Sequence, residues 1–350
     1  MPKVVPATRR QLTLLLAVAG IAVGVLAAAL IPVPYVILGP GPTLNTLGKD
    51  SSGQPLITIS GHPSYPTSGH LNMVTVTYQG CQGDTFNIFT ALVAWLNPHE
   101  AVVPESEICP PGQTQQQTQR QNTQQMNSSQ QSATAAALTE LHIPYTQQVV
   151  VAQTVPGYPA YGVLRAGDVI TAVDGKQVTG ESDLSTLISA HPAGSTLTVT
   201  ILRGGQTRQV QVGTKLSAGH PVLGVQVTEQ YKFPFDVTIS VGDIGGPSAG
   251  LMFALGIIDK LTPMNLTGGK FIAGTGEIEA TGKVDPIGGI QQKMIGARNA
   301  GATIFLTPAS NCADAKGAVP AGLRLVSVST LSQAVNDLEA IHAGQQVPSC

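Results

Sequence analysis

Residues 237–260 of this 350-residue chain read VTISVGDIGGPSAGLMFALGIIDK, and this stretch decides the fold of the C-terminal part. An alternating, β-branched run ends at Val241, and a glycine-rich loop follows it. Pro247 then precedes an apolar helix, where its missing N–H is harmless because the first helical amides have no partner within the helix. Ser248 is therefore predicted where a loop meets a helix amino terminus, and free N–H groups there can stabilise an oxyanion.

A nucleophilic serine needs a general base, and the sequence offers two kinds. The pattern Gly246-x-Ser248-x-Gly250 also fits the nucleophile elbow of α/β-hydrolases, which require a histidine downstream. The one downstream histidine, His342, lies in an ordinary amphipathic helix near the end of the chain. Lys293 follows a Gly-Gly turn at the start of a small apolar helix, where a desolvated lysine can act as the base.

Three linked motifs resemble the proteolytic domain of Lon proteases in both order and spacing. They are residues 246–250 (GPSAG), 274–278 (GTGEI) and 282–293 (GKVDPIGGIQQK). The resemblance implies that Ser248 is the nucleophile and Lys293 its base. It also implies that Thr275 helps to orient the lysine amine by hydrogen bonding. Gly246 and Ala249 are expected beside the serine as supporting groups or oxyanion donors.

The chain departs from ATP-dependent Lon enzymes at two points. Many of them carry an acidic residue just before the GPSAG string, where this chain has Gly245. No Gly-x-x-x-x-Gly-Lys-[Ser/Thr] loop occurs, and residues 267–270 (TGGK) lack the first glycine of such a loop. The resemblance therefore implies a serine endopeptidase that uses neither ATP nor a cofactor and cleaves unfolded segments or exposed tails.

A different, β-rich pattern begins at residue 147 and resembles a PDZ domain of the bacterial protease-associated type. The matching segments are residues 159–164 (PAYGVL), 167–170 (GDVI) and 173–175 (VDG). Asp168 and Asp174 are expected to form turns rather than to catalyse, because Gly-Asp and Asp-Gly pairs favour tight turns.

The amino terminus carries an uncharged apolar run, residues 11–31, whose length of about twenty residues suffices to span a bilayer core. Lys3, Arg9 and Arg10 precede this run and no acidic residue does, so the positive-inside rule places the amino terminus in the cytoplasm and the bulk of the chain outside. We expect an uncleaved signal anchor in the cell membrane. A signal peptide cleaved near residues 27–29 (AAA) and a buried helix of a soluble protein are the alternatives.

Four cysteines suit an oxidising compartment, and they allow three connectivities. We favour Cys81 with Cys109 and Cys312 with Cys350, because each pair lies within one region of the sequence. Four buried free thiols are the alternative. No cysteine or histidine spacing typical of zinc occurs, so no metal site is predicted.

Two further features limit the function. The formal net charge is only −2, which gives no basic field for binding nucleic acid. Residues 113–131 contain ten glutamines and too few apolar groups to form a core alone, so an exposed helix or a mobile arm without chemistry is expected there.

The sequence predicts an α+β chain in four parts. These are a cytoplasmic tail and membrane anchor (1–36), a linker with strands, a helix and the glutamine-rich segment (37–141), a PDZ domain (142–216) and a Lon-like domain (217–350). Few residues separate the PDZ domain from Ser248, so we hypothesise that residues 57–97 supply the first part of the protease domain. The PDZ domain would then be inserted within it rather than precede it.

The whole arrangement resembles the bacterial, membrane-anchored, PDZ-containing Lon-like proteases. This resemblance implies polypeptide substrates, a peptide or protein ligand of the PDZ domain and a homo-oligomeric ring such as a hexamer. A PDZ fold binds an extended peptide as an added strand, and we expect Val149, Val150 and Val151 along that groove. A PDZ adaptor with an idle Lon-like domain is the second hypothesis, which the presence of both Ser248 and Lys293 disfavours.

Overall fold

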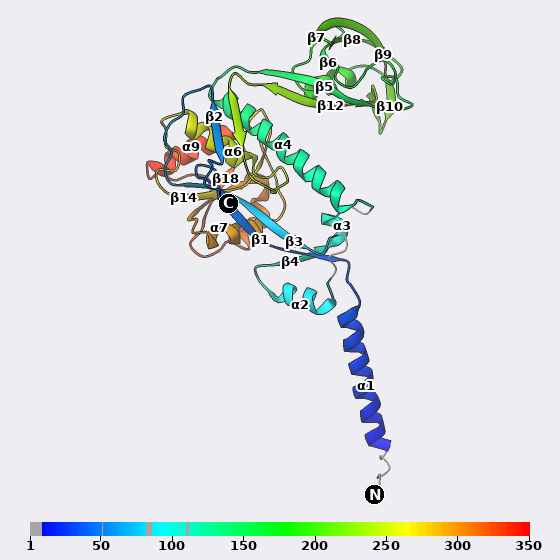
Figure 1. The fold of residues 1–350 in the computed structure, drawn as a ribbon, viewed down its shortest axis with the longest axis vertical. Coiled ribbons are helices and arrows are strands. Elements are labelled where there is room, and N and C mark those ends of the chain that lie inside the picture. Colours follow the sequence, from blue (N-terminus) through cyan, green and yellow to red (C-terminus); the bar gives the residue numbers. More distant parts are fainter. Residues whose placement is uncertain (1–8, 51, 82–85, 110–111) are drawn as a thin grey trace. The chain divides into compact units, whose positions relative to one another are not determined.

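A computed structural model describes residues 9–50, 52–81, 86–109 and 112–350 (Figure 1). Of the basic residues before the apolar run, Lys3 lies outside these ranges. The chain forms two compact units, of which the first joins Met1–Leu141 to Val237–Cys350 and the second is His142–Asp236. The second unit is therefore inserted in the sequence of the first.

The first unit is a mixed α/β structure. Its strands are β1 (Tyr35–Asn45), β2 (Ile57–Ser60), β3 (His70–Gln79), β4 (Ala101–Pro104), β13 (Asp236–Ile239), β14 (Phe271–Gly274), β15 (Glu277–Ile278), β16 (Val284–Asp285), β17 (Ile304–Pro308) and β18 (Arg324–Val328). Its helices are α1 (Arg9–Leu30), α2 (Ile88–Leu96), α3 (Glu105–Ile108), α4 (Gln115–Glu140), α6 (Gly250–Leu261), α7 (Ile290–Asn299), the 3₁₀ turn η1 (Ala309–Asn311), α8 (Cys312–Lys316) and α9 (Leu331–His342).

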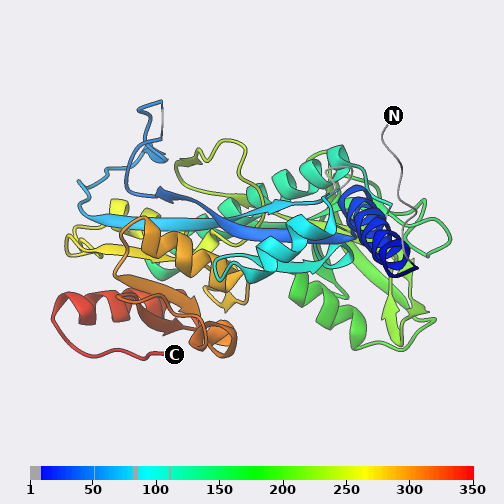
Figure 2. The ribbon, with the colours of Figure 1, turned by 90° about the horizontal axis from the view of Figure 1, so that it is seen from below.

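Six of these strands form one sheet in the order β18-β17-β14-β3-β1-β4 (Figure 1 and Figure 2). The pairs from β18 to β3 are parallel, and β3, β1 and β4 pair antiparallel. β3 comes before the inserted unit in the sequence and pairs with β14, which comes after it. β2 and β13 also pair across the insertion. The segment that carries β2 and β3 thus pairs with strands that follow the inserted unit.

Helices cover both faces of this sheet, because neighbouring residues of a strand point to opposite sides. On β14, Ala273 packs in one apolar core with Met294 of α7. The next residue, Gly274, faces the other way, where an added Cβ would lie 2.7 Å from the sulfur of Met252 on α6. α6 and α7 thus lie on opposite faces of the sheet.

α1 exposes its large apolar side chains on all sides. Over its span Leu12–Leu30 none of the helix is buried, which is the reverse of a buried helix in a soluble protein. By length and composition it is the one described helix that can cross a membrane, and a signal sequence would have the same properties.

The second unit is a β-rich domain with its own core. Its elements are β5 (Thr146–Thr154), β6 (Val169–Val173), β7 (Lys176–Gln177), α5 (Glu181–Ser189), β8 (Thr196–Arg203), β9 (Gln206–Gly213), β10 (Lys215–Ser217), β11 (His220–Val222) and β12 (Val225–Lys232). The main sheet has the order β12-β5-β6-β8-β9. Residues 217–236 belong to this unit rather than to the protease part, because β12 pairs with β5 along its whole length.

Both aspartates predicted to form turns in this unit do so. Asp168 is 1% exposed, and its carboxylate accepts hydrogen bonds from the N–H of Arg165 at 2.8 Å and from the Arg203 guanidinium at 2.6 and 2.7 Å. Asp174 has a φ of 47° and accepts a hydrogen bond from the N–H of Thr198 at 2.7 Å.

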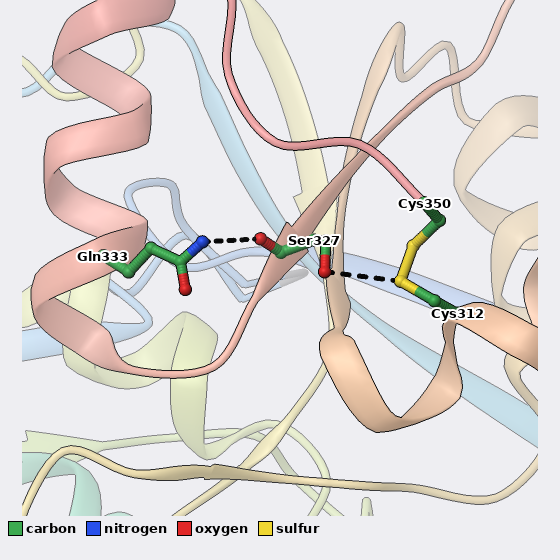
Figure 3. Close-up of a disulfide and its surroundings, with 4 residues drawn as sticks. All are labelled: Cys312, Ser327, Gln333 and Cys350. Atoms are coloured by element: carbon green, nitrogen blue, oxygen red, sulfur yellow. Dashed lines mark hydrogen bonds between the residues drawn. A yellow bond between two sulfur atoms is a disulfide. The ribbon is translucent and has the colours of Figure 1, made fainter.

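The structure joins the cysteines in two disulfides, Cys81 to Cys109 and Cys312 to Cys350. The second ties the end of the chain to the start of α8 (Figure 3). Beside it the hydroxyl of Ser327 donates to the sulfur of Cys312 at 3.3 Å, and the Ser327 carbonyl accepts from the Gln333 amide at 2.9 Å.

Candidate active site

Ser248 lies two residues before the start of α6, in the loop that the sequence predicted. Its position depends on Gly246, whose φ of 90° is a left-handed conformation that favours glycine. It also depends on Gly250, where an added Cβ would lie 2.8 Å from Ile278 and 3.0 Å from the Ser129 hydroxyl. The glycines of the GPSAG string therefore let the serine loop turn and approach its neighbours closely.

Lys293 lies in the first turn of α7, which the Gly-Gly turn starts. Gly289 has a φ of 67°, and an added Cβ there would lie 2.8 Å from Val76 on β3. The N–H of Lys293 then donates to the Gly289 carbonyl at 3.0 Å, which begins the helix. The glycine thus fixes where α7 starts and so which side of the helix carries the lysine.

The structure brings Ser248, Lys293 and Thr275 together. The lysine Nζ lies 2.7 Å from the serine Oγ and 3.1 Å from the threonine Oγ1. The threonine hydroxyl donates its own proton to the carbonyl of Ser248 at 2.9 Å. Its oxygen is therefore left to accept from the lysine amine.

The lysine and the threonine are both buried, which decides the charge of the amine. Lys293 is 2% exposed and Thr275 is 0% exposed. Burial lowers the pKa of Lys293 from 10.5 to about 7, because a desolvated ammonium loses its hydration. The described residues place no carboxylate in an ion pair with this lysine. A large fraction of the amine is therefore neutral near pH 7 and can accept a proton.

A pocket of about 750 Å³ opens beside Ser248 and Lys293. Its walls are largely apolar, with Met73, Val76 and Met126 among the lining residues. The disulfide between Cys81 and Cys109 also borders it. Such a pocket can hold an extended chain segment against the serine hydroxyl.

The glutamine-rich segment, to which we assigned no chemistry, forms α4 and holds the serine loop. The helix begins with a capping box between Thr114 and Gln117. Further along, the carbonyl of Asn122 accepts from the N–H of Gly246 at 3.1 Å, and the hydroxyl of Ser129 donates to the carbonyl of Pro247 at 2.8 Å.

The same helix explains why residue 245 is a glycine here. An added Cβ on Gly245 would lie 2.6 Å from the Cβ of Asn122, closer than real Cβ contacts allow. An acidic side chain at this position would therefore force α4 away from the loop. In this chain α4 occupies the space that an acidic side chain at residue 245 would need.

Of the two residues predicted to help bind an oxyanion, Gly246 and Ala249, only Ala249 has an N–H group that is free to do so among the described residues. The N–H of Gly246 is already occupied by the Asn122 carbonyl. Ala249 is the N-cap of α6, so its N–H lies at the positive end of the helix dipole. Within the described part of the chain, neither Ser248 nor Ala249 uses its N–H in a recorded hydrogen bond. Those two amides, and not that of Gly246, are suited to an oxyanion.

His342, the base that a hydrolase elbow would need, is not part of this pocket. It lies at the end of α9 next to Gly268, where an added Cβ would lie 2.7 Å from the imidazole Nδ1. It is absent from the residues that line the pocket around Ser248.

The predicted PDZ groove residues do not form an open strand edge. Val149, Val150 and Val151 lie in β5, which pairs with β12 on one side and with β6 on the other. All three are buried, with exposures of 0%, 6% and 1%. The two terminal strands of this sheet are β12 and β9, and β12 lies next to α5. The expected groove residues are corrected accordingly.

Comparison with known families agrees with this arrangement. The Lon protease (S16) C-terminal proteolytic domain matches residues 232–340, and the PDZ domain matches residues 120–214. The PDZ match begins inside α4 and ends before β12, whereas the compact unit runs His142–Asp236. The unit extends past the end of the match because β12 completes its sheet.

Among proteins of known identity, the chain is 28% identical over 182 residues to Lon protease 1 of Bacillus subtilis, covering 49% of this chain and 23% of that protein. It is 37% identical over 94 residues to Lon protease 2 of Herpetosiphon aurantiacus, covering 26% and 11%. A solved PDZ domain of the SdrC-like protein from Listeria monocytogenes is 26% identical, with a TM-score of 0.22, over 23% of this chain and 85% of that one. The chain spans less than a quarter of the length of either Lon relative. The matches to both domains confirm the two resemblances seen in the sequence: the chain carries a PDZ domain and a Lon-type proteolytic domain of the serine peptidase kind.

Proposed function

We propose that this chain is an endopeptidase that cleaves polypeptides with Ser248 as nucleophile and Lys293 as general base. The observation that carries the proposal is the 2.7 Å contact between the lysine Nζ and the serine Oγ. A serine hydroxyl is a weak nucleophile until a base takes its proton, and the lowered pKa of Lys293 supplies a neutral amine near pH 7.

The proton follows the hydrogen bonds of the site. Neutral Lys293 accepts the proton of Ser248 while the serine oxygen attacks the scissile carbonyl carbon. The resulting ammonium donates to Thr275 and then gives its proton to the leaving amine. The N–H groups of Ser248 and Ala249 receive the oxyanion. Water repeats the sequence on the acyl-enzyme and restores the free serine.

Hydrolysis by this chain is proposed to need no ATP. Its 350 residues contain no phosphate-binding Gly-x-x-x-x-Gly-Lys-[Ser/Thr] loop, the element with which P-loop motors hold their nucleotide. The substrates are accordingly unfolded segments or exposed tails that reach the pocket without being pulled.

The site is proposed to work outside the cytoplasm on a membrane anchor. The span Leu12–Leu30 of α1 is apolar on all sides, and Lys3, Arg9 and Arg10 come before it, which favours a cytoplasmic amino terminus. The two disulfides suit an oxidising compartment. The family resemblance also favours a homo-oligomeric ring.

The inserted PDZ domain is proposed to bind a peptide along β12. An edge strand beside a helix can accept an extended segment through backbone hydrogen bonds, and β12 beside α5 has this arrangement. A substrate or an adaptor bound there would be held on the same polypeptide as the protease site.

An active-site-directed fluorophosphonate tests the catalytic proposal. We expect the full-length protein to be labelled at Ser248 and to cleave an unfolded, fluorescent casein equally well with and without ATP. Lys293→Met should abolish both, whereas Lys283→Met should not, because Lys283 is exposed and paired with Glu279 and Asp285.

Each rival function predicts a different result in the same assay. An idle PDZ adaptor would show neither labelling nor cleavage in the wild-type protein. An esterase of the hydrolase type would keep its labelling in Lys293→Met and lose it in His342→Ala. Cleavage that depends on added ATP would overturn the motor-free part of the proposal alone.

A further inference from the structure

Helix α2 turns its large apolar side chains away from the protein. Its sequence, IFTALVAWL, contains a single polar residue, Thr90. Only Ala91 and Ala94 face the protein, with exposures of 9% and 3%. The exposed side chains are Ile88 (50%), Phe89 (40%), Leu92 (49%), Val93 (69%), Trp95 (70%) and Leu96 (68%). A surface helix of a soluble domain has the opposite arrangement, so this face requires an apolar partner.

The start of α2 is fixed next to the end of α1. Leu30 is the last residue of α1, and three residues later the N–H of Val33 donates to the carbonyl of Phe86 at 3.1 Å. Pro32 also forms a bridge with Asn87, the N-cap of α2. The two helices therefore meet where the candidate membrane span ends.

The other end of the same segment is also tied down. β4, which follows α2, pairs with the start of β1, so that Tyr35 lies opposite Pro104. The disulfide between Cys81 and Cys109 closes the segment that carries α2. The exposed face is thus part of a closed segment attached to the first residues after α1, and not a loose arm.

We propose that α2 lies in the interfacial layer of the lipid bilayer beside the end of α1, with Trp95 at the level of the headgroups. The proposal rests on the membrane anchoring by α1 proposed above. The position of α2 next to the end of a span makes lipid the apolar partner, and tryptophan is enriched at this depth. Because α2 carries no charged residue, apolar burial alone should hold it, with no requirement for anionic lipid.

This placement has a consequence for the substrate. The disulfide that closes the α2 segment also borders the active-site pocket, as does Ile108 of α3. A pocket tied to a membrane-docked segment in this way favours substrate segments close to the membrane surface, such as the juxtamembrane tails of other anchored proteins.

Trp95 is the only tryptophan in the chain, so its fluorescence reports on α2 alone. The full-length protein is reconstituted in phosphatidylcholine vesicles, with and without lipid that is brominated near the headgroup. We expect the brominated lipid to lower the Trp95 emission about twofold, and equally so at high salt or with anionic lipid added. Resistance to extraction at alkaline pH reports separately on whether α1 spans the membrane.

Two kinds of control locate the effect on α2. The double variant Val93→Glu/Leu96→Glu should weaken the quenching, whereas Leu216→Glu on β10 should not, although Leu216 is 61% exposed and equally apolar. Removing the reporter with Trp95→Phe should abolish the tryptophan emission and with it the quenching, because the chain contains no second tryptophan.

The two measurements separate the inference from the anchoring on which it rests. Protein that resists extraction but shows no quenching of Trp95 overturns the docking of α2 and leaves the anchor intact. Quenching in protein that alkaline treatment extracts supports the docking and overturns the span. Loss of both readouts overturns both. Shielding of Trp95 from a soluble quencher without quenching by brominated lipid would show that a protein surface covers α2, and would also overturn the proposal.

Discussion

The hydroxyl of Ser129 on α4 donates a hydrogen bond to the carbonyl of Pro247 at 2.8 Å, although 118 residues separate the two. Ser129 is 5% exposed and does not line the pocket, so its contact positions the loop and not the substrate. Ser129→Ala removes a hydrogen bond worth about 1 kcal/mol and leaves the Pro247 carbonyl with only the longer bond from the N–H of Gly250, at 3.4 Å. We expect kcat for casein cleavage to fall about fivefold with KM unchanged.

The neighbouring serine provides the matched control for this prediction. Ser128 lies on the same helix but is exposed, so Ser128→Ala should keep the wild-type kcat. A folded Ser129→Ala variant with wild-type kcat would show that α4 does not hold the catalytic loop.

Ser248 and Lys293 could be predicted from the sequence because the backbone around each of them requires glycine at fixed positions. Gly246 and Gly289 have left-handed conformations, and Gly250 and Gly289 approach other elements too closely for a Cβ. Such positions leave a fixed pattern of glycines around Ser248 and Lys293. That pattern is readable without knowledge of the rest of the fold.

The role of α4 could not be found in the same way. Its packed face consists mainly of small residues, with Ala133 and Ala135–Ala137 among them, and its exposed face is mostly glutamine. The hydrophobic periodicity is therefore weak, and the segment resembles a low-complexity tract. Its contacts with Gly246 and Pro247 join segments that lie on either side of the inserted domain in the sequence, and no local sequence pattern indicates such contacts.

The peptide groove was misplaced for a related reason. Val149, Val150 and Val151 have the composition of a strand, but composition does not tell an edge strand from a central one. The side of β5 that was expected to be free pairs with β12, which follows about eighty residues later in the sequence. The sequence had placed those residues in the next domain.

The pH dependence of cleavage follows from the state of Lys293. Its pKa of about 7 means that the ammonium predominates below pH 7 and the neutral base above it. We expect kcat to rise with pH through about 7 and then to level off, as a plot of rate between about pH 5 and pH 9 would show. Lys283→Met should leave this curve unchanged, whereas a rate independent of pH over the same range would exclude Lys293 as the base.

The buried lysine should also cost stability, with a defined sign. An unfolded lysine titrates near 10.5, so between about pH 7 and pH 10 the unfolded state binds more protons and stability rises with pH. Lys293→Met removes the penalty, so its Tm should exceed that of the wild type at pH 7. The difference should shrink as pH approaches 10. A lower Tm for Lys293→Met at pH 7 would show that the amine is not penalised by burial.

Peptide binding should depend on the groove between β12 and α5. Leu187 on α5 and Val227 on β12 are both partly buried against the core of the PDZ domain. We expect Leu187→Lys to lower the affinity for peptides selected from a C-terminal peptide library, measured by fluorescence anisotropy, by about tenfold. Leu216→Lys, on the exposed β10, should bind as the wild type does. Equal affinities in all three proteins would place the ligand elsewhere.

Thr275 links the base to the nucleophile, and its removal should change the chemistry more than the binding. Its hydroxyl accepts from Lys293 at 3.1 Å and donates to the Ser248 carbonyl at 2.9 Å, and the N–H of Gly276 donates to that same carbonyl at 2.9 Å. Thr275→Val keeps the shape and removes both hydroxyl contacts, so kcat should fall at least about tenfold while KM stays constant.

The conservative variant separates positioning from packing at this residue. Thr275→Ser retains the hydroxyl and should recover most of the activity, although it removes a buried methyl group. Because Thr275→Val deletes an acceptor that stabilises the ammonium, the midpoint of its pH–rate curve should also move to lower pH. If serine fails to restore kcat and the midpoint does not move, Thr275 acts through packing alone and does not orient the amine.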